Sequence, residues 1–199
     1  MRRAIGNAWQ RIMRVGIAVV LLAVPVKFSA AHEKRVVGVR IADLERLTTH
    51  EGLPLQLSGL KGRPFIVAFG YTGCPDVCPT TLLELSNDLQ SLGRDGDRIS
   101  VLFITVDPDG DTADTLRAYL ESFDRRIVGL TGNMIDIEAV AHAFNAAYER
   151  VSRPDGGYTY DHTTRTYYFD RYGLLAGRHD ILKDAGKKRR DMMRRLLAQ

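Results

Sequence analysis

The sequence predicts an α/β fold in which helices flank a mixed central sheet. Two continuous apolar runs, residues 64–70 and 99–106, contain many β-branched and aromatic residues, which is typical of strands buried on both faces. Each run is followed by a segment with apolar residues at three- and four-residue steps, as in an amphipathic helix. We see no internal repeat and no low-complexity linker, so one domain is expected over residues 32–199.

The predicted helices have recognisable ends. Gly93 ends the first helix, and Thr112 can cap the first turn of the second. The four helices cover residues 79–92, 113–123, 134–148 and 181–197. The basic residues of the last helix are expected to form a solvated face over apolar residues that pack inward.

The predicted strands alternate with these helices. Residues 36–41 and 53–60 give only weak extended patterns. A hairpin is expected to close the domain, in which residues 158–162 and 166–170 lead to a turn at 171–173 and then to residues 174–178. The strands cover residues 64–70, 99–106, 127–130, 158–162, 166–170 and 174–178. This order of elements predicts an α/β sandwich of the thioredoxin-like arrangement.

Composition and charge exclude some classes of function. The chain is 45% hydrophobic and 26% charged, as in ordinary globular proteins, so disorder is not expected. Its net charge of +4 comes from the two ends, because residues 1–31 carry five basic residues and no acid, and residues 183–199 carry seven basic and two acidic. No aromatic residues lie among the basic residues of the tail, so nucleic-acid binding is not predicted. Contact of the tail with anionic lipid is an alternative to a solvated face.

Residues 1–31 have the features of an export signal. Basic residues precede the apolar run 15–26, and Ser29 and Ala31 are the small residues of a cleavage site before His32. The run is about a dozen residues long, which is shorter than the ~20 needed to span a bilayer. We predict a cleaved signal peptide, with an uncleaved membrane anchor as the alternative. The domain is then periplasmic or otherwise extracytoplasmic.

The two cysteines of the chain, Cys74 and Cys78, are four residues apart where a strand leads into a helix. Residues i and i+4 lie on one side of a helical turn, so the thiols are expected to be neighbours. The N-terminus of the helix favours thiolate, because its dipole and free N–H groups stabilise negative charge. Thiolates bind soft metals and also exchange with disulfides. The pair therefore predicts either a metal site or a disulfide between Cys74 and Cys78.

A histidine would complete a three-ligand copper site. Two thiolates can hold Cu(I), and a nitrogen ligand would also allow Cu(II). Among the five histidines, His162 lies beside predicted strand residues and next to Asp161, which could orient its imidazole. The residues alone leave this assignment open, because a lone histidine is usually structural. Zinc is less favoured, because a closed zinc site takes four protein ligands. The five histidines are His32, His50, His142, His162 and His179.

An acidic loop follows the second buried strand. It contains Asp107, Asp109 and Asp111, at the same carboxyl edge of the sheet as the cysteines. We interpret it as a solvated turn with a helix cap, and docking of a partner protein is the alternative.

The segment Phe69-Gly-Tyr-Thr-Gly-Cys-Pro-Asp-Val-Cys-Pro-Thr-Thr-Leu82 resembles the signature loop of the Sco/SenC family of copper proteins. Residues 105–112, 130–132 and 155–163 are similar to later landmarks of that family, in the same order. The resemblance runs from about Leu53 to the C-terminus. It implies a thioredoxin-like fold in which Cys74, Cys78 and His162 are ligands of copper, as Cu(I) and Cu(II).

The same resemblance implies a copper chaperone. Such a protein delivers copper to the CuA centre of cytochrome c oxidase, or reduces the cysteines there, while the oxidase is assembled. Its partners would be the copper subunit of the oxidase and other copper chaperones, with attachment to the membrane through the N-terminus as an option. We expect a carrier and not an enzyme, so no catalytic residue is assigned.

An exported thiol–disulfide oxidoreductase or redox sensor is the alternative from another class. It would use Cys74 and Cys78 in exchange chemistry. Three residues separate these cysteines, where thioredoxins have two, and this alternative gives His162 no task.

Overall fold

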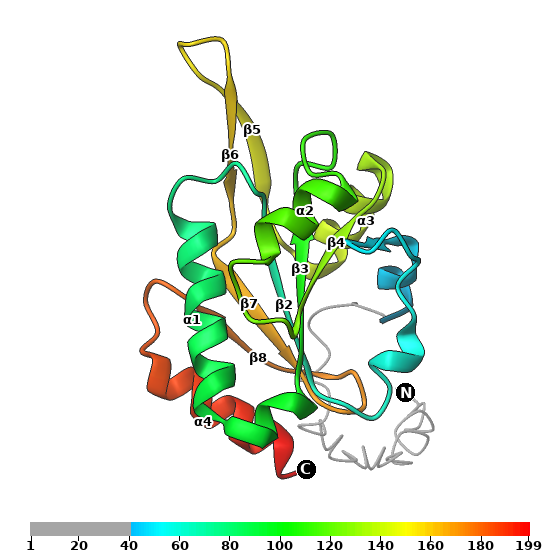
Figure 1. Ribbon diagram of the computed structural model, residues 1–199, viewed down its shortest axis with the longest axis vertical. Helices are drawn as coiled ribbons and strands as arrows, with labels where there is room; N and C mark the ends of the chain where they lie inside the picture. The colour runs from blue at the N-terminus through cyan, green and yellow to red at the C-terminus, as the bar shows by residue number, and fades with distance from the viewer. Residues whose placement is uncertain (1–40) are drawn as a thin grey trace, which may run out of the picture. The chain divides into compact units, whose positions relative to one another are not determined.

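The computed structural model describes residues 41–199, in which six strands form one mixed sheet (Figure 1). The strand order is β1-β4-β3-β2-β7-β8. Strands β2, β3 and β4 are parallel, and the other pairings in this sheet are antiparallel. The predicted α/β class with a mixed central sheet is confirmed. The strands are β1 (Thr48–Thr49), β2 (Phe65–Gly70), β3 (Ser100–Thr105), β4 (Ile127–Thr131), β7 (Arg165–Phe169) and β8 (Leu175–Asp180).

Helices cover both faces of this sheet, and each face has its own apolar core. Alternate residues of β2 point to opposite faces, so Ile66 and Phe65 belong to different cores. Helices α1, α2 and α4 cover one face, and α3 with the 3₁₀ helix η2 covers the other. The helices are η2 (Ile41–Arg46), η3 (Leu57–Gly59), α1 (Val77–Ser91), η4 (Gly93–Arg98), α2 (Ala113–Leu120), α3 (Met134–Phe144) and α4 (Gly186–Leu197).

Aromatic packing fixes α3 on the central strand. The Phe144 ring lies edge-on to Phe69 and Tyr167, with centroids 5.3 Å apart in both pairs. Each such pair contributes about 0.5–1.5 kcal/mol beyond the area that it buries. Phe69 is the penultimate residue of β2, which leads into residues 71–78, here called the cysteine loop because they contain both cysteines. The base of that loop is therefore held in a rigid core.

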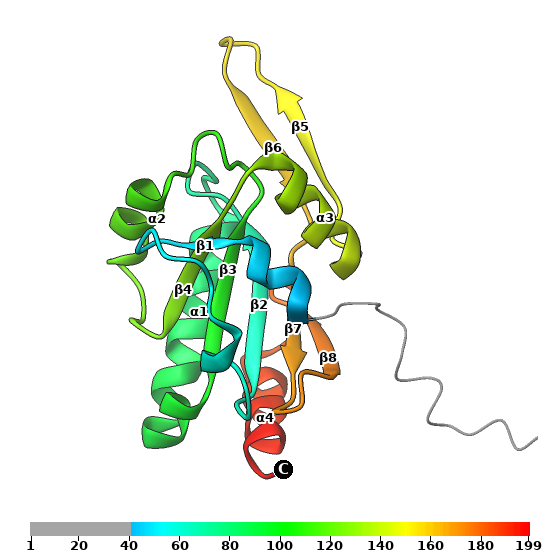
Figure 2. The ribbon, with the colours of Figure 1, turned by 90° about the vertical axis from the view of Figure 1, so that its right-hand side faces the viewer.

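The predicted helix over 134–148 is wrong at its C-terminal end. It stops at Phe144 because Asn145 adopts a left-handed conformation (φ 51°), which asparagine tolerates and which ends a helix. A strand that was not predicted follows, β5 (Tyr148–Ser152). It pairs with β6 (Tyr158–His162) in a separate two-stranded sheet, which extends away from the central sheet as an arm (Figure 2).

The closing hairpin is confirmed at its predicted turn, residues 171–173, but residues 158–162 do not belong to it. Strand β6 pairs with β5, and β7 pairs with β8 around the turn at Asp170–Leu174. His162 therefore lies at the end of the arm strand β6. Other boundaries differ less: α1 begins at Val77 and α4 at Gly186, and the region 53–60 contains η3 with a single bridge from Pro54 to Thr48.

The expectations for residues 1–31 and 36–40 lie outside the described residues. Between residues 41 and 199, no helix combines the length and the apolar character needed to cross a membrane.

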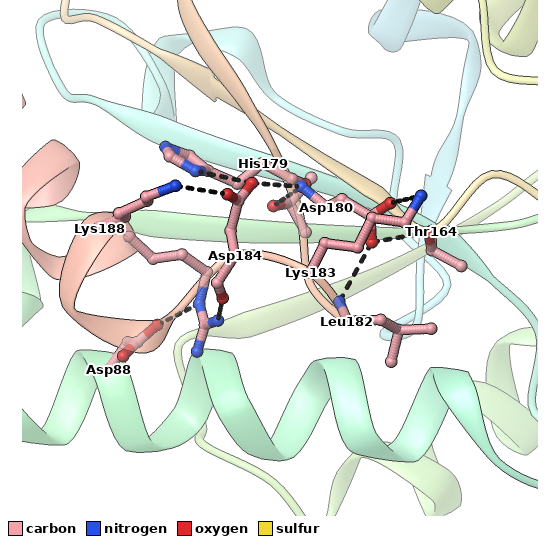
Figure 3. A network of polar contacts seen from close by, with 10 residues as sticks. Asp88, Thr164, His179, Asp180, Leu182, Lys183, Asp184 and Lys188 are labelled. Carbon is pink, nitrogen blue, oxygen red and sulfur yellow. Dashed lines mark hydrogen bonds and ion pairs between the residues drawn. The ribbon is translucent and has the colours of Figure 1, made fainter.

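Helix α4 packs its apolar side inward as expected, with Met193 and Leu196 buried. The expectation that its basic residues are all solvated is wrong for Arg189, which is 1% exposed. Its Nε donates to the buried Asp88 carboxylate of α1 at 2.7 Å, and Nη1 donates to the Asp184 carbonyl at 2.9 Å. The side chains of Asp184 and Asp88 belong to one polar network beside α1 (Figure 3). This network joins α4 to α1.

Candidate metal centre

The structure brings Cys74, Cys78 and His162 together, although Cys78 and His162 are 84 positions apart in the sequence. Sγ of Cys78 lies 3.1 Å from Nε2 of His162. The three ligand atoms all lie within 4.8 Å of one another. In the described part of the chain, this is the one group of three or more such side chains that could hold a metal ion.

The end of β2 and the start of α1 position the two cysteines. Strand β2 ends at Gly70, and Cys78 falls in the first turn of α1. Both thiols are buried, Cys78 (1% exposed) more deeply than Cys74 (8%). Cys74 is therefore the more accessible of the two thiols.

Gly70 makes room for the Cys78 thiol. A Cβ at this position would lie 2.7 Å from the Cys78 sulfur and 2.7 Å from a ring carbon of Phe103, much closer than van der Waals contact. Only glycine therefore fits here without displacing a neighbour.

Replacing Gly70 with alanine is expected to lower the free energy of unfolding by about 1–3 kcal/mol, because overpacking a dense core forces side chains off their positions. Urea unfolding would measure the loss. Gly59→Ala is the matched control, since a Cβ there meets nothing within 4 Å. A Gly70→Ala variant as stable as the Gly59→Ala variant would contradict this account.

The imidazole of His162 is prepared to act as a nitrogen ligand. Its Nδ1 donates to the Thr163 carbonyl at 3.0 Å, which leaves the lone pair on Nε2 facing Cys78. Burial lowers the pKa of His162, against the opposing effects of that carbonyl and of Asp161, so the ring is neutral at neutral pH. The ring is thus oriented by the hydrogen bond that it donates to a backbone carbonyl. Asp161, the residue expected to orient it, is exposed.

The expected thiolate character is not found at Cys78. Burial raises the pKa of this thiol, and a hydrogen bond with Cys74 raises it further. Desolvation disfavours the charged form more than the helix N-terminus favours it. In the metal-free protein Cys78 therefore keeps its proton at neutral pH.

The interpretation of the acidic loop as a solvated turn is wrong for two of its three residues. Asp111 is 1% exposed and Asp107 is 5% exposed, while Asp109 lies at the surface. Asp111 accepts hydrogen bonds from the Thr105 hydroxyl (2.6 Å) and from the hydroxyl and N–H of Thr72 (2.6 and 3.0 Å). Burial raises its pKa. Asp111 thus fixes the cysteine loop through its hydrogen bonds with Thr72, a role that the sequence did not indicate.

Two sulfur atoms and one imidazole nitrogen make a soft donor set. It suits Cu(I), and the nitrogen also allows Cu(II). A closed tetrahedral zinc site would take a fourth protein ligand, and the group within residues 41–199 has three members. The chemistry of the site therefore fits copper better than zinc.

Comparison with known proteins identifies the family of the chain. The SCO1/SenC family model matches residues 44–197. A SCO2-like protein of Rickettsia typhi is 32% identical over 158 residues, which cover 78% of this chain and 77% of that protein. A SCO2-like protein of Rickettsia prowazekii is 38% identical over 116 residues, 57% of each chain. The chain thus matches little more than half the length of that second relative.

Solved structures show the same fold. ScoI of Bradyrhizobium japonicum with copper bound has a TM-score of 0.69 and 38% identity, covering 75% of this chain and 95% of that chain. Yeast Sco1 with copper bound has a TM-score of 0.66 and 28% identity, covering 75% and 83%. The fold is thioredoxin-like, as predicted. The family model spans both cysteines and the histidine, and on this evidence the chain belongs to the SCO1/SenC family.

Proposed function

We propose that this protein is a copper carrier that holds Cu(I) and Cu(II) with Cys74, Cys78 and His162. The observation that carries the proposal is the convergence of two thiols and one neutral imidazole nitrogen within 4.8 Å. The copper-bound structures of ScoI and of yeast Sco1 support the choice of metal.

Transfer of copper would proceed by ligand exchange. A thiolate of the acceptor binds the copper ion as Cys74, the more exposed of the two cysteines, leaves it. Copper keeps its oxidation state in this exchange, and the departing thiolate takes up a proton from solvent. No bond of the acceptor is broken, so the proposed role is that of a carrier and not of an enzyme.

The acceptor that we propose is the copper subunit of cytochrome c oxidase, with another copper chaperone as the donor. The resemblance of the cysteine loop to the Sco/SenC signature supports this assignment. The export pattern of residues 1–31 supports a place outside the cytoplasm, either free after cleavage or attached to the membrane.

The test is copper binding by the reduced full-length chain. We expect one copper per chain, lost in the Cys74→Ser, Cys78→Ser double variant. His162→Ala should weaken Cu(II) binding by at least about 10–100-fold, the cost of losing a residue that only supports a ligand. Competition with chromophoric chelators measures both affinities. His142→Ala is the matched control, because His142 is exposed on α3. If the wild-type chain binds copper no better than the double variant, the proposal is wrong.

A thiol–disulfide exchange function is the second candidate. It is favoured by one observation, the presence of two free thiols with sulfur atoms within 4.8 Å of each other. The raised pKa of Cys78 weighs against it, because exchange needs a thiolate. Rapid reduction of insulin disulfides, without specific copper binding, would support this function over the carrier.

A further inference from the structure

We propose that Tyr71 is a positioning residue that sets the place of His162 relative to the two cysteines, and so favours binding of Cu(II). This inference rests on the proposed copper site. Tyr71 lies in the cysteine loop, directly after Gly70, and is 3% exposed.

The need for such a residue follows from the topology. The cysteines follow the carboxyl end of β2, an interior strand of the six-stranded sheet. His162 lies on β6 in the two-stranded arm. In the described residues β6 pairs only with β5, so no ladder of backbone hydrogen bonds joins it to the central sheet. The chain enters β7 of the central sheet at Arg165, three residues after His162, which holds one end of β6. The rest of the distance between His162 and the cysteines depends on contacts made by side chains.

The Tyr71 hydroxyl makes two such contacts with β6. It lies 2.7 Å from the hydroxyl of Thr159, and it accepts the backbone N–H of Tyr160 at 3.2 Å. The Tyr71 ring also lies edge-on to the rings of Tyr160 and His162, with centroids 5.4 and 6.1 Å away. One side chain of the cysteine loop thus contacts three residues of the strand that carries the histidine, and the histidine is one of them.

The Tyr160 N–H that donates to Tyr71 lies on the side of β6 that is not paired with β5. Thr163 donates to the Ala147 carbonyl, so the odd-numbered residues at this end of β6 face β5 with their backbone groups. In an antiparallel pair the intervening residues point their N–H groups the other way. The Tyr160 N–H therefore faces away from β5, and the Tyr71 hydroxyl takes the place that a further strand would have.

A second contact between the arm and the central domain lies farther from the site. The Tyr158 hydroxyl donates to Asp107 at 2.9 Å, four residues before His162 and near the tip of the arm. Tyr71 acts only two residues before the histidine, at Tyr160. Loss of its hydroxyl should therefore move the imidazole more than loss of the contact at the tip.

The two oxidation states of copper should respond differently. Cu(I) can be held by two thiolates alone, whereas Cu(II) depends on the nitrogen ligand. A displaced imidazole therefore weakens Cu(II) binding more than Cu(I) binding. A general loss of packing would instead weaken both together.

The experiment compares Tyr71→Phe with the wild-type full-length chain. Phenylalanine keeps the ring contacts and removes both hydrogen bonds. We expect Cu(II) affinity to fall about tenfold and Cu(I) affinity to fall less than about threefold. The sulfur-to-Cu(II) absorption band and the EPR spectrum should shift with it. In a His162→Ala background the same substitution should change neither affinity, because the residue acts through the imidazole.

Tyr148→Phe is the matched control. Tyr148 lies opposite His162 in the β5–β6 register, and its hydroxyl donates to the Met134 sulfur and not to the cysteine loop. It should leave both affinities unchanged. If Tyr71→Phe folds poorly, Thr159→Val removes one of the two hydroxyl contacts from the other side and should lower Cu(II) affinity selectively.

Three results would overturn the inference. Unchanged Cu(II) affinity in both variants shows that the hydroxyl does not position the histidine. Equal losses for Cu(I) and Cu(II) show a purely structural role. An undiminished effect in the His162→Ala background shows that Tyr71 does not act through His162. A wild-type chain that binds no copper is a separate result, because it refutes the proposed function itself.

Discussion

Replacing Asp88 with alanine is expected to lower the free energy of unfolding by about 3–5 kcal/mol, because it breaks a buried ion pair from one side. Asp88 is fully buried and accepts from Arg189 Nε at 2.7 Å and from Arg190 Nη1 at 2.9 Å. Alanine leaves the guanidinium of Arg189 buried with Glu84 as its remaining carboxylate partner. Urea unfolding followed by circular dichroism would measure the loss.

Asp191→Ala is the control for this prediction. Asp191 also has two cationic partners, Lys187 at 3.0 Å and Arg194 at 3.3 Å, but its side chain is 38% exposed. Exposed pairs contribute little, so the expected loss is below about 1 kcal/mol. Similar losses for the two variants would show that burial of the Asp88 pair does not matter.

Cu(I) affinity is expected to rise at least about 100-fold between pH 6 and pH 8, because the metal must displace the proton of Cys78, and any proton that it displaces from Cys74 makes the rise steeper. Burial raises the pKa of this thiol, so it stays protonated across that range in the metal-free protein. Each unit of increase in pH lowers the competing proton concentration tenfold, and affinity rises with it. The lowered pKa of His162 means that the imidazole is already neutral over most of the range and adds little to the slope.

A Cu(I) chelator of known pH dependence would measure this slope by competition. His162→Ala is a suitable comparison, because it should lower the affinity for Cu(II) while it preserves the slope for Cu(I). A flat profile in the wild-type chain would mean that Cys78 is already ionised without metal, contrary to its buried position.

The elements that the sequence predicted well are those with a local signature. Strands β2 and β3 are continuous apolar runs, and the Thr112 side chain caps α2 by accepting the Thr115 N–H, as expected. Strand β5 has no such signature, because its residues are half-exposed or exposed and show no clean alternation. Its pairing with β6 depends on the left-handed Asn145, whose conformation the sequence does not reveal.

The residues of the candidate site also differ in how far the sequence could predict them. The spacing of Cys74 and Cys78 indicated their proximity directly, whereas His162 needed either a family resemblance or the fold to bring it near. Burial of single polar residues could not be predicted. Asp111 lies in a segment that has the composition of a turn, and Arg189 lies in a basic run whose carboxylate partner is 101 residues away.

The candidate ligands are divided between the loop and helix that follow β2 and the two-stranded arm, so a bound metal ion would connect the two parts. An ion held by Cys78 and His162 together would close a loop of 84 residues, much as a covalent cross-link does. If the protein carries copper as proposed, the copper-bound form is mechanically stiffer than the copper-free form, and release of the ion loosens the arm. A protein that binds the arm of such a carrier would then distinguish the copper-bound form from the copper-free form without contacting the metal.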